Sequence, residues 1–205
     1  MHIDLIIDAN LTPAQLAELA MAAERGGIRT LWHPNMHACR DAFVALVPAA
    51  MATSRIRLGV LAVSPFEMHP MKIATSLLSL NEIAGGRATV AIGGGGSVLS
   101  AVRTDGIQID YKALRVVRGV REALEIVRGA AHGTLSRPYA GELFQVVRPA
   151  RTQWGGPPPA QVFAAADGPQ MTRLAGRLAD GVMFGDLTIH RAAEVVADIR
   201  PGMAR

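Results

Sequence analysis

Polar side chains able to transfer protons or form hydrogen bonds gather in one short segment of the chain. His33, Asn35 and His37 lie within five positions of one another, at the end of an apolar stretch. Histidine titrates near neutral pH and serves as acid, base or hydrogen-bond donor. We predict that Asn35 and His37 are catalytic, and that His33 and Asp8 contact the substrate. The alternatives are solvated loop histidines and, for Asp8, a turn that leads into a helix cap at Thr12.

Two further segments have the composition of a site for a flat or anionic ligand, and a third candidate, at the end of the third predicted strand, is unremarkable by composition. Glycines after a strand let the backbone approach a ring or a phosphate. A turn before a helix that begins at Pro169 exposes free N–H groups, and the helix dipole adds to their attraction for phosphate. The alternatives are a flexible loop, a simple chain reversal and an ordinary strand end. The residues are Gly93, Gly94 and Gly95, then Ala166, Asp167 and Gly168, and finally Leu61, Ala62 and Val63.

These residues must be positioned by a scaffold, and the sequence alternates apolar stretches with amphipathic ones six times. Thr12, Pro13 and Gln15 form a helix start with a capping box, and Gly26 ends that helix. Such alternation predicts a parallel α/β sheet covered by helices, either open and doubly wound or closed as a barrel. In both folds ligands bind at the carboxyl ends of the strands. The predicted strands are residues 3–7, 28–33, 56–63, 88–92, 160–166 and 181–184.

Several details of the helices also follow from the sequence. Asp41 is the expected cap of the second helix, and Pro48 inside it should produce a kink. A long basic helix is expected from Asp110 to about Arg128. Residues 134–158 have the composition of a loop excursion.

The composition argues against several classes of protein. The formal net charge is +4, but the arginines are scattered and no aromatics interleave with them, so no nucleic-acid partner is expected. No G-x-G-x-x-G follows the first strand, which argues against a dinucleotide-binding Rossmann fold. No G-x-x-x-x-G-K-[ST] is present either, which excludes a P-loop. Cys39 is the only cysteine and no third ligand accompanies the histidines, so we expect no metal site. No apolar run reaches the ~18 residues of a membrane span, and we expect a single cytoplasmic domain over residues 1–205.

The order of several motifs resembles the luciferase-like monooxygenase and F-420-dependent oxidoreductase family. Members of that family carry patterns similar to those in this chain from about residue 3 to residue 195. The matching segments are 53–59 (TSRIRLG), Pro65, 69–70 (HP), 80–87 (LNEIAGGR), 92–93 (IG), 139–144 (YAGELF), 165–171 (AADGPQM) and 174–182 (LAGRLADGV).

The resemblance implies a TIM-type (β/α) barrel that uses coenzyme F-420 or FMN to oxidise or reduce a small organic substrate. It implies a non-prolyl cis peptide at the end of the third strand, which falls at Leu61-Ala62 here. It also implies that the 166–168 turn holds the cofactor phosphate and that Gly93 to Gly95 line the ring. The alternative is a non-catalytic flavin- or deazaflavin-binding or subunit-type relative.

This sequence departs from the family pattern in three places. Many deazaflavin members carry an acidic residue before a histidine after the second strand, where this chain has Asn35, Met36 and His37. The acidic residue that some members carry after the glycines is Gly96 here. The usual glycine at the cis bond is Leu61. The acid–base pair of the family is therefore incomplete at these positions.

About six of the eight strand–helix units of such a barrel are expected in this chain. An open barrel leaves two unpaired strand edges and exposes its interior. We therefore predict a homodimer, or a complementing chain, rather than a stable isolated monomer. The apolar residues expected to face the interior are Ile6, Leu58, Val60, Val90 and Val182.

Overall fold

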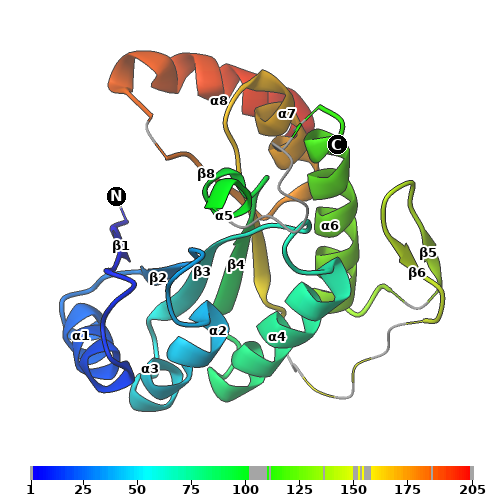
Figure 1. Cartoon of the computed structure of the whole chain (residues 1–205). Helices are drawn as coiled ribbons and strands as arrows, with labels where there is room; N and C mark the ends of the chain where they lie inside the picture. The colour runs from blue at the N-terminus through cyan, green and yellow to red at the C-terminus, as the bar shows by residue number, and fades with distance from the viewer. Residues whose placement is uncertain are drawn as a thin grey trace.

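Six parallel strands form one sheet in the computed structural model of this chain (Figure 1). The structure describes residues 2–101, 110, 112–135, 137–149, 152, 154, 158–185 and 187–203. The strand order β1-β2-β3-β4-β7-β8 follows the chain without reversal, which distinguishes it from the doubly wound alternative. The predicted strands are all confirmed: β1 Asp4–Ile6, β2 Thr30–Pro34, β3 Arg57–Val63, β4 Ala88–Ile92, β7 Gln161–Ala165 and β8 Gly181–Met183.

Helices follow the strands and cover the outside of the sheet (Figure 1). The predicted capping box is present, because Gln15 N donates to Thr12 Oγ1 and Thr12 N donates to Gln15 Oε1. The helices are α1 Pro13–Arg25, α2 Ala42–Ala45, α3 Val47–Ala52, α4 Pro70–Ile83, α5 Gly96–Ala101, α6 Val116–Ala131, α7 Pro169–Leu178 and α8 Ile189–Met203.

Three details differ from the sequence prediction. The helix capped by Asp41 is two helices, and Pro48 lies in the first turn of α3, where its missing N–H costs no hydrogen bond. The long helix begins at Val116 rather than after Asp110. Asp110 Oδ1 instead accepts hydrogen bonds from the backbone N–H groups of Lys112 and Ala113, in a turn before the helix. The predicted loop excursion contains a hairpin of β5 Tyr139–Ala140 and β6 Gln145–Val146.

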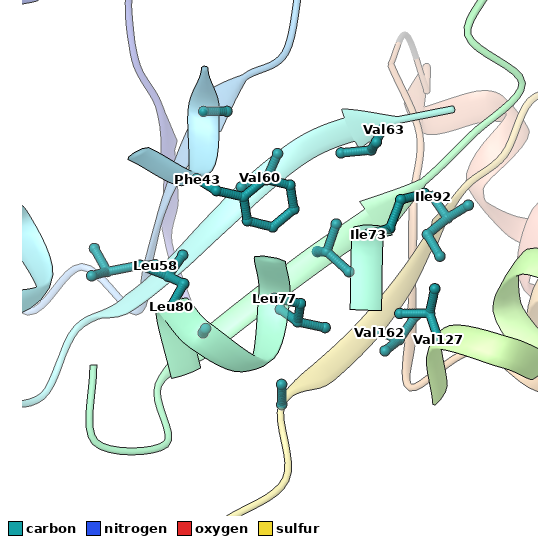
Figure 2. Packing of buried hydrophobic residues seen from close by; sticks show 14 of the residues in the cluster. Phe43, Leu58, Val60, Val63, Ile73, Leu77, Leu80, Ile92, Val127 and Val162 are labelled. Atoms are coloured by element: carbon teal, nitrogen blue, oxygen red, sulfur yellow. The ribbon is translucent and has the colours of Figure 1, made fainter. Parts of the chain in front are cut away.

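The main apolar core lies between the convex face of the sheet and the helices. Figure 2 shows Leu58 of β3 close to Leu80 of α4, and Val60, Ile73 and Leu77 belong to the same buried cluster. Burying a side chain of this size contributes about 1.5–3 kcal/mol. The layer between sheet and helices therefore supplies most of the hydrophobic stabilisation.

This core corrects the predicted lining of the barrel interior. Leu58, Val60 and Val90 belong to the cluster that meets the helices, and Val182 packs against the same cluster. Only Ile6 lies on the concave face, because it is in register with Trp32, and its side chain is 58% exposed. The error arose because apolar residues alternate along a strand without indicating which face is which.

The concave face is instead occupied by an aromatic contact. The rings of Trp32 in β2 and Phe163 in β7 meet edge to face, with centroids 5.4 Å apart. Two strands, β3 and β4, separate them, and a flat sheet would hold β2 and β7 about 14 Å apart. Contact therefore requires a strongly curled sheet. Gly59 and Gly181 leave room for it, since a Cβ at either position would lie 2.2 Å from one of these rings.

Glu24 of α1 fixes the chain just before β3. Its carboxylate accepts hydrogen bonds from the backbone N–H groups of Ser54, Arg55 and Ile56, at 3.0, 2.6 and 2.8 Å. Partial burial alone would raise the pKa of Glu24, but these three donors outweigh it and lower the pKa to about 2.

We predict that Gly59→Ala destabilises the fold by about 1–3 kcal/mol, because the new methyl group overlaps the Trp32 ring. Gly129→Ala in α6 is the control. There a Cβ finds its nearest neighbours at 3.6 Å, so the substitution should stabilise the helix by about 0.5–1 kcal/mol. Urea unfolding measures both effects. Equal midpoints for Gly59→Ala and the parent protein would contradict the curled packing.

We predict that Glu24→Gln lowers stability at pH 7 and flattens its acid dependence. The pKa of Glu24 is depressed in the folded chain, so its contribution is present above the ordinary value of 4.5 and is lost as the pH falls towards 2. Unfolding midpoints measured between pH 2.5 and 7 test this. Glu18→Gln, exposed on the same helix, should leave the pH profile unchanged.

Candidate functional site

A cleft of about 490 Å³ opens at the carboxyl ends of β2, β3, β4 and β7. This is the edge at which parallel α/β folds bind ligands. Its apolar wall includes Met36 after β2, Val116 of α6 and Met171 of α7. The predicted site residues that line it are Asn35, Leu61, Ala62, Gly93, Gly94, Gly95 and Asp167.

The end of β3 has the geometry that the family resemblance implies. The Leu61-Ala62 peptide bond is cis. The pairing of β3 with β4 shifts register between Val60 and Val63 at the same place. Leu61 and Ala62 lie in the cleft wall, whereas the predicted ligand residue Val63 is buried against the helices and does not line the cleft. β3 therefore contributes its backbone bend, rather than all three residues, to the cleft.

The glycine loop after β4 is fastened to this bend. Ser64 Oγ donates to the carbonyl oxygen of Gly94 at 3.2 Å and accepts from the N–H of Phe66. Gly95 has φ +78°, and a Cβ there would lie 2.5 Å from Ser64 Cβ. Glycine is required at this position for both reasons. The loop is thus held in the cleft wall rather than free.

Asn35 lies in the same wall, tied to the end of β3. Its backbone N–H donates to Leu61 O at 2.7 Å. Its side-chain Nδ2 donates to Ala62 O at 3.3 Å and to Glu67 Oε1 at 2.7 Å. Glu67 Oε1 also accepts from Ser64 N at 2.9 Å. Burial raises the pKa of Glu67 although these two hydrogen bonds oppose the shift.

The other polar candidates do not reach the cleft. His37 is exposed and is not part of its wall. His33 is fully buried in register with Val60, so it faces the helices, and its Nδ1 contacts Pro34 O at 2.8 Å. Burial lowers the pKa of His33, which favours the neutral ring. Side chains alternate between the two faces of a strand, and His33 falls on the face that meets the helices rather than the cleft. The composition of the segment does not show which face a residue occupies.

Asp8 lies in a turn, the alternative to the predicted contact with substrate. Its Oδ1 accepts from the backbone and side-chain nitrogens of Asn10, at 2.8 and 3.0 Å, and its carbonyl oxygen accepts from Leu11 N. This is a turn that leads into the Thr12 cap. Asp8 is exposed and does not line the cleft.

The turn before α7 contributes to two neighbouring hollows. Asp167 lines both the cleft and a smaller cavity of about 110 Å³, and Gly168 lines only the smaller one. Gly168 has φ +83°, and the side on which a Cβ would project is open. Ala166 is buried and lines neither hollow. The N–H groups in the first turn of α7 therefore begin beside an open approach to the backbone.

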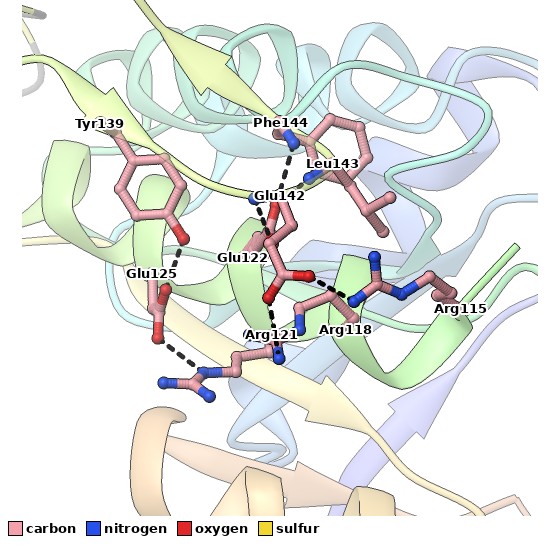
Figure 3. A network of polar contacts seen from close by, with 9 residues as sticks. All are labelled: Arg115, Arg118, Arg121, Glu122, Glu125, Tyr139, Glu142, Leu143 and Phe144. Atoms are coloured by element: carbon pink, nitrogen blue, oxygen red, sulfur yellow. Dashed lines mark hydrogen bonds and ion pairs between the residues drawn. The ribbon is translucent and has the colours of Figure 1, made fainter.

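The β5–β6 hairpin packs on the outer side of α6 and is held by that helix (Figure 1 and Figure 3). The buried carboxylate of Glu122 accepts from the backbone N–H groups of Glu142, Leu143 and Phe144, each at 2.9 Å. The Phe144 ring then packs near Phe66, which directly follows the β3 bend, with centroids 6.1 Å apart. The hairpin thus supports the bend from outside.

Charged partners add to the hold on the hairpin (Figure 3). Arg115, which immediately precedes α6, and Arg118 within it form ion pairs with Glu142. The Tyr139 hydroxyl donates to Glu125, and burial together with this carboxylate raises the pKa of Tyr139. Burial makes the larger contribution to that shift.

Glu67 and Glu122 were missed by sequence reasoning. A usable pattern existed for Glu67, because residues 64–67 have the S-x-x-E pattern of a capping box. Only one half of the box forms, from Ser64 N to Glu67 Oε1, since Ser64 Oγ accepts from Phe66 N instead. No comparable local pattern marks Glu122, whose partners lie 20 to 22 residues away.

The described residues contain no group of three His, Cys, Asp or Glu side chains arranged to hold a metal ion. Among the same residues, no helix combines the length and apolar character needed to cross a bilayer.

The curled parallel sheet of six strands, with a cleft at the carboxyl ends of its strands, has the architecture of part of a (β/α) barrel. Residues 2–205 match the family model described as luciferase-like monooxygenase. The chain belongs to this family. Its fold also matches an F420-dependent secondary alcohol dehydrogenase solved with an F420-acetone adduct, with a TM-score of 0.84 at 18% identity, covering 99% of this chain and 64% of that one.

Curated relatives include a methylenetetrahydromethanopterin reductase and an F420-dependent dehydrogenase. The chain is 31% identical to 5,10-methylenetetrahydromethanopterin reductase of Archaeoglobus fulgidus, over 79% of its own length and 46% of that protein. It is 29% identical to the F420-dependent glucose-6-phosphate dehydrogenase of Kineococcus radiotolerans, over 82% of its own length and 51% of that protein. The chain therefore spans about half the length of the curated relatives it matches.

Proposed function

We propose that this chain binds coenzyme F-420 or FMN in the 490 Å³ cleft and serves the oxidation or reduction of a small organic substrate. The observation that carries the proposal is the joint geometry of the β3 bend and the glycine loop. Gly93 and Ala62 converge there, with a Cβ at Gly93 only 3.6 Å from that of Ala62. The wall so formed is rich in backbone and small side chains, which lets a planar ring approach it closely.

The chain's own residues have separate tasks in this proposal. Leu61, Ala62 and the glycine loop form the surface against which a ring would rest, and Met36 and Val116 exclude water from it. When bound, a deazaflavin or reduced flavin would supply the redox chemistry itself. The protein's share is to orient ring and substrate and to keep the cleft dry.

The turn before α7 is the proposed phosphate site. The open side of Gly168 allows close approach to the backbone, and N–H groups at a helix N-terminus attract anions. Asp167 of this turn lines both the smaller cavity and the cleft, so the two hollows are adjacent. A cofactor with a ring in the cleft and a phosphate at Gly168 would span both.

A non-catalytic binding role is the second candidate. Among the described residues of the cleft wall, Asp167 is the one with an ionisable side chain, and neither His33 nor His37 contributes. Catalysis would then depend on Asn35 or on groups of the substrate and cofactor. Absorbance titration with each cofactor, followed by assay of turnover with small alcohols, distinguishes the two roles: binding with turnover supports the enzyme, and binding without turnover supports the second candidate.

We predict that Gly168→Val weakens binding of FMN or F-420 by about tenfold or more, equivalent to ~1.4 kcal/mol. The valine side chain would occupy the open approach to the backbone. Gly133→Val is a matched control, since Gly133 also has a positive φ of +68° and open space at its Cβ position but lies after α6. Both variants place valine at a positive φ, but only Gly168 lies beside the proposed phosphate site, so only the first should lose affinity. Equal cofactor affinities of the Gly168→Val and Gly133→Val variants would contradict a phosphate site at this turn.

We also propose that a second copy of the chain, rather than a different complementing polypeptide, covers apolar surface on α2, α3 and α4. Val44, Met51 and Ile83 are 69%, 77% and 44% exposed. Val44 and Ile83 border one groove together with Phe43 and Leu80. Burial of such a surface would contribute ~25 cal/mol per Å².

Sedimentation tests this association. The chain should sediment as a species larger than its 21.7 kDa monomer, and Val44→Glu should shift it to the monomer by burying a charge in the contact. Val147→Glu, at a position 77% exposed on the segment after β6, should behave as the parent. A parent chain that is monomeric at all concentrations would overturn the proposal.

A further inference from the structure

The carboxamide of Asn35 has only one orientation compatible with its neighbours. Its side chain faces two oxygen atoms, Ala62 O at 3.3 Å and Glu67 Oε1 at 2.7 Å. A peptide carbonyl oxygen can only accept a hydrogen bond, and a carboxylate oxygen likewise accepts. Both positions must therefore be met by the NH₂ group of Asn35.

This arrangement uses both N–H donors of the Asn35 side chain. An amide has two donors and one acceptor oxygen, so the oxygen is the group that remains. Among the described residues, none donates a hydrogen bond to Asn35 Oδ1 in the structure. Because Asn35 lies in the cleft wall, this oxygen is the polar group it can offer to a ligand.

The carboxylate of Glu67 is itself fixed in the position that orients the Asn35 side chain. Its Oε1 also accepts from Ser64 N at 2.9 Å, which fixes the carboxylate relative to the β3 bend. Ser64 is fully buried, so this anchor does not move with the surface. Hydrogen bonds to a charged acceptor are roughly twice as strong as neutral ones, which makes Glu67 the stronger of the two constraints on Asn35.

We infer that Glu67 is a positioning residue that locks Asn35 as a hydrogen-bond acceptor, so that the cleft selects a ligand presenting an N–H or O–H group to Asn35. The identity of that ligand rests on the proposed function, whereas the locked orientation does not. A flavin or deazaflavin ring carries an N–H group, and an alcohol substrate carries an O–H group. A ligand that presents a carbonyl oxygen at this point would meet another oxygen and be disfavoured.

The orientation is tested first in the free protein, by NMR of the Asn35 side-chain NH₂ group. The signal is assigned by its disappearance in Asn35→Leu. Glu67→Gln keeps the shape but can present either oxygen or nitrogen to Asn35, so hydrogen exchange of the NH₂ protons should accelerate by about tenfold. Glu82→Gln, on the exposed side of α4, should leave the rate unchanged. If Glu67→Gln does not fold, Glu67→Asp keeps the charge, shortens the reach, and should give the same acceleration.

The second measurement asks whether Glu67 acts through Asn35. Dissociation constants for FMN and for F-420 are measured for Glu67→Gln, Asn35→Leu and the double variant. Each single variant should weaken binding of the better cofactor by about three- to tenfold, and the double variant should bind no more weakly than Asn35→Leu alone. A merely structural role for Glu67 would instead give additive losses.

The outcomes separate this inference from the proposed function. Unchanged exchange of the Asn35 NH₂ protons in both Glu67 variants, or additive losses in the binding cycle, would overturn the inference. Failure of the unsubstituted chain to bind either cofactor, with accelerated exchange still observed, would overturn the proposed function and leave the locked orientation supported.

Discussion

The curl of the sheet is the constraint on which the rest of the structure depends. Trp32 and Phe163 can touch across two intervening strands only because Gly59 and Gly181 leave space beneath them. The same curl brings the carboxyl ends of β2, β3, β4 and β7 around one cleft. Without it, Asn35 and Asp167 would lie on a broad open edge instead of in one wall. Packing at the centre of the sheet thus determines the geometry of its mouth.

The cleft wall is stabilised by contacts among loops rather than by the strands alone. Asn35 joins the end of β2 to the β3 bend, and Ser64 joins that bend to the glycine loop through Gly94. Glu67 connects with both Asn35 and Ser64. Loops that carry function are commonly positioned by a rigid scaffold, and here they also position one another. A ligand in the cleft would meet one continuous surface built from three loops.

Much of the fold follows from local sequence patterns. Alternation of apolar stretches indicated all six strands, and Thr12 with Gln15 indicated the start of α1. The family motifs indicated the cis bond at Leu61-Ala62. These features are local, so a short window of residues contains the information. The glycines at 93–95 were likewise found from composition.

The directions of side chains could not be obtained in this way. His33 and Trp32 are adjacent, yet the first faces the helices and the second the barrel interior. Which of two neighbours turns inward depends on the curl, a property of the whole sheet. Glu67 and its partner Asn35 are 32 residues apart in the sequence. Glu122 and the hairpin N–H groups that it binds are 20 to 22 residues apart. Long-range partners of this kind are fixed by tertiary packing alone.

The grip of Glu122 on the hairpin has a consequence for how this region tolerates change. Glu122 accepts hydrogen bonds from main-chain N–H groups at positions 142 to 144, so this contact tolerates any side chain at positions 142 and 143 except proline, which lacks the N–H. Gly141 is the exception, because a Cβ there would lie 2.4 Å from Glu122 Oε2. Glycine is therefore required at position 141, whereas positions 142 and 143 can be substituted without loss of the contact with Glu122. Phe144 would keep its contact with Phe66 through such changes.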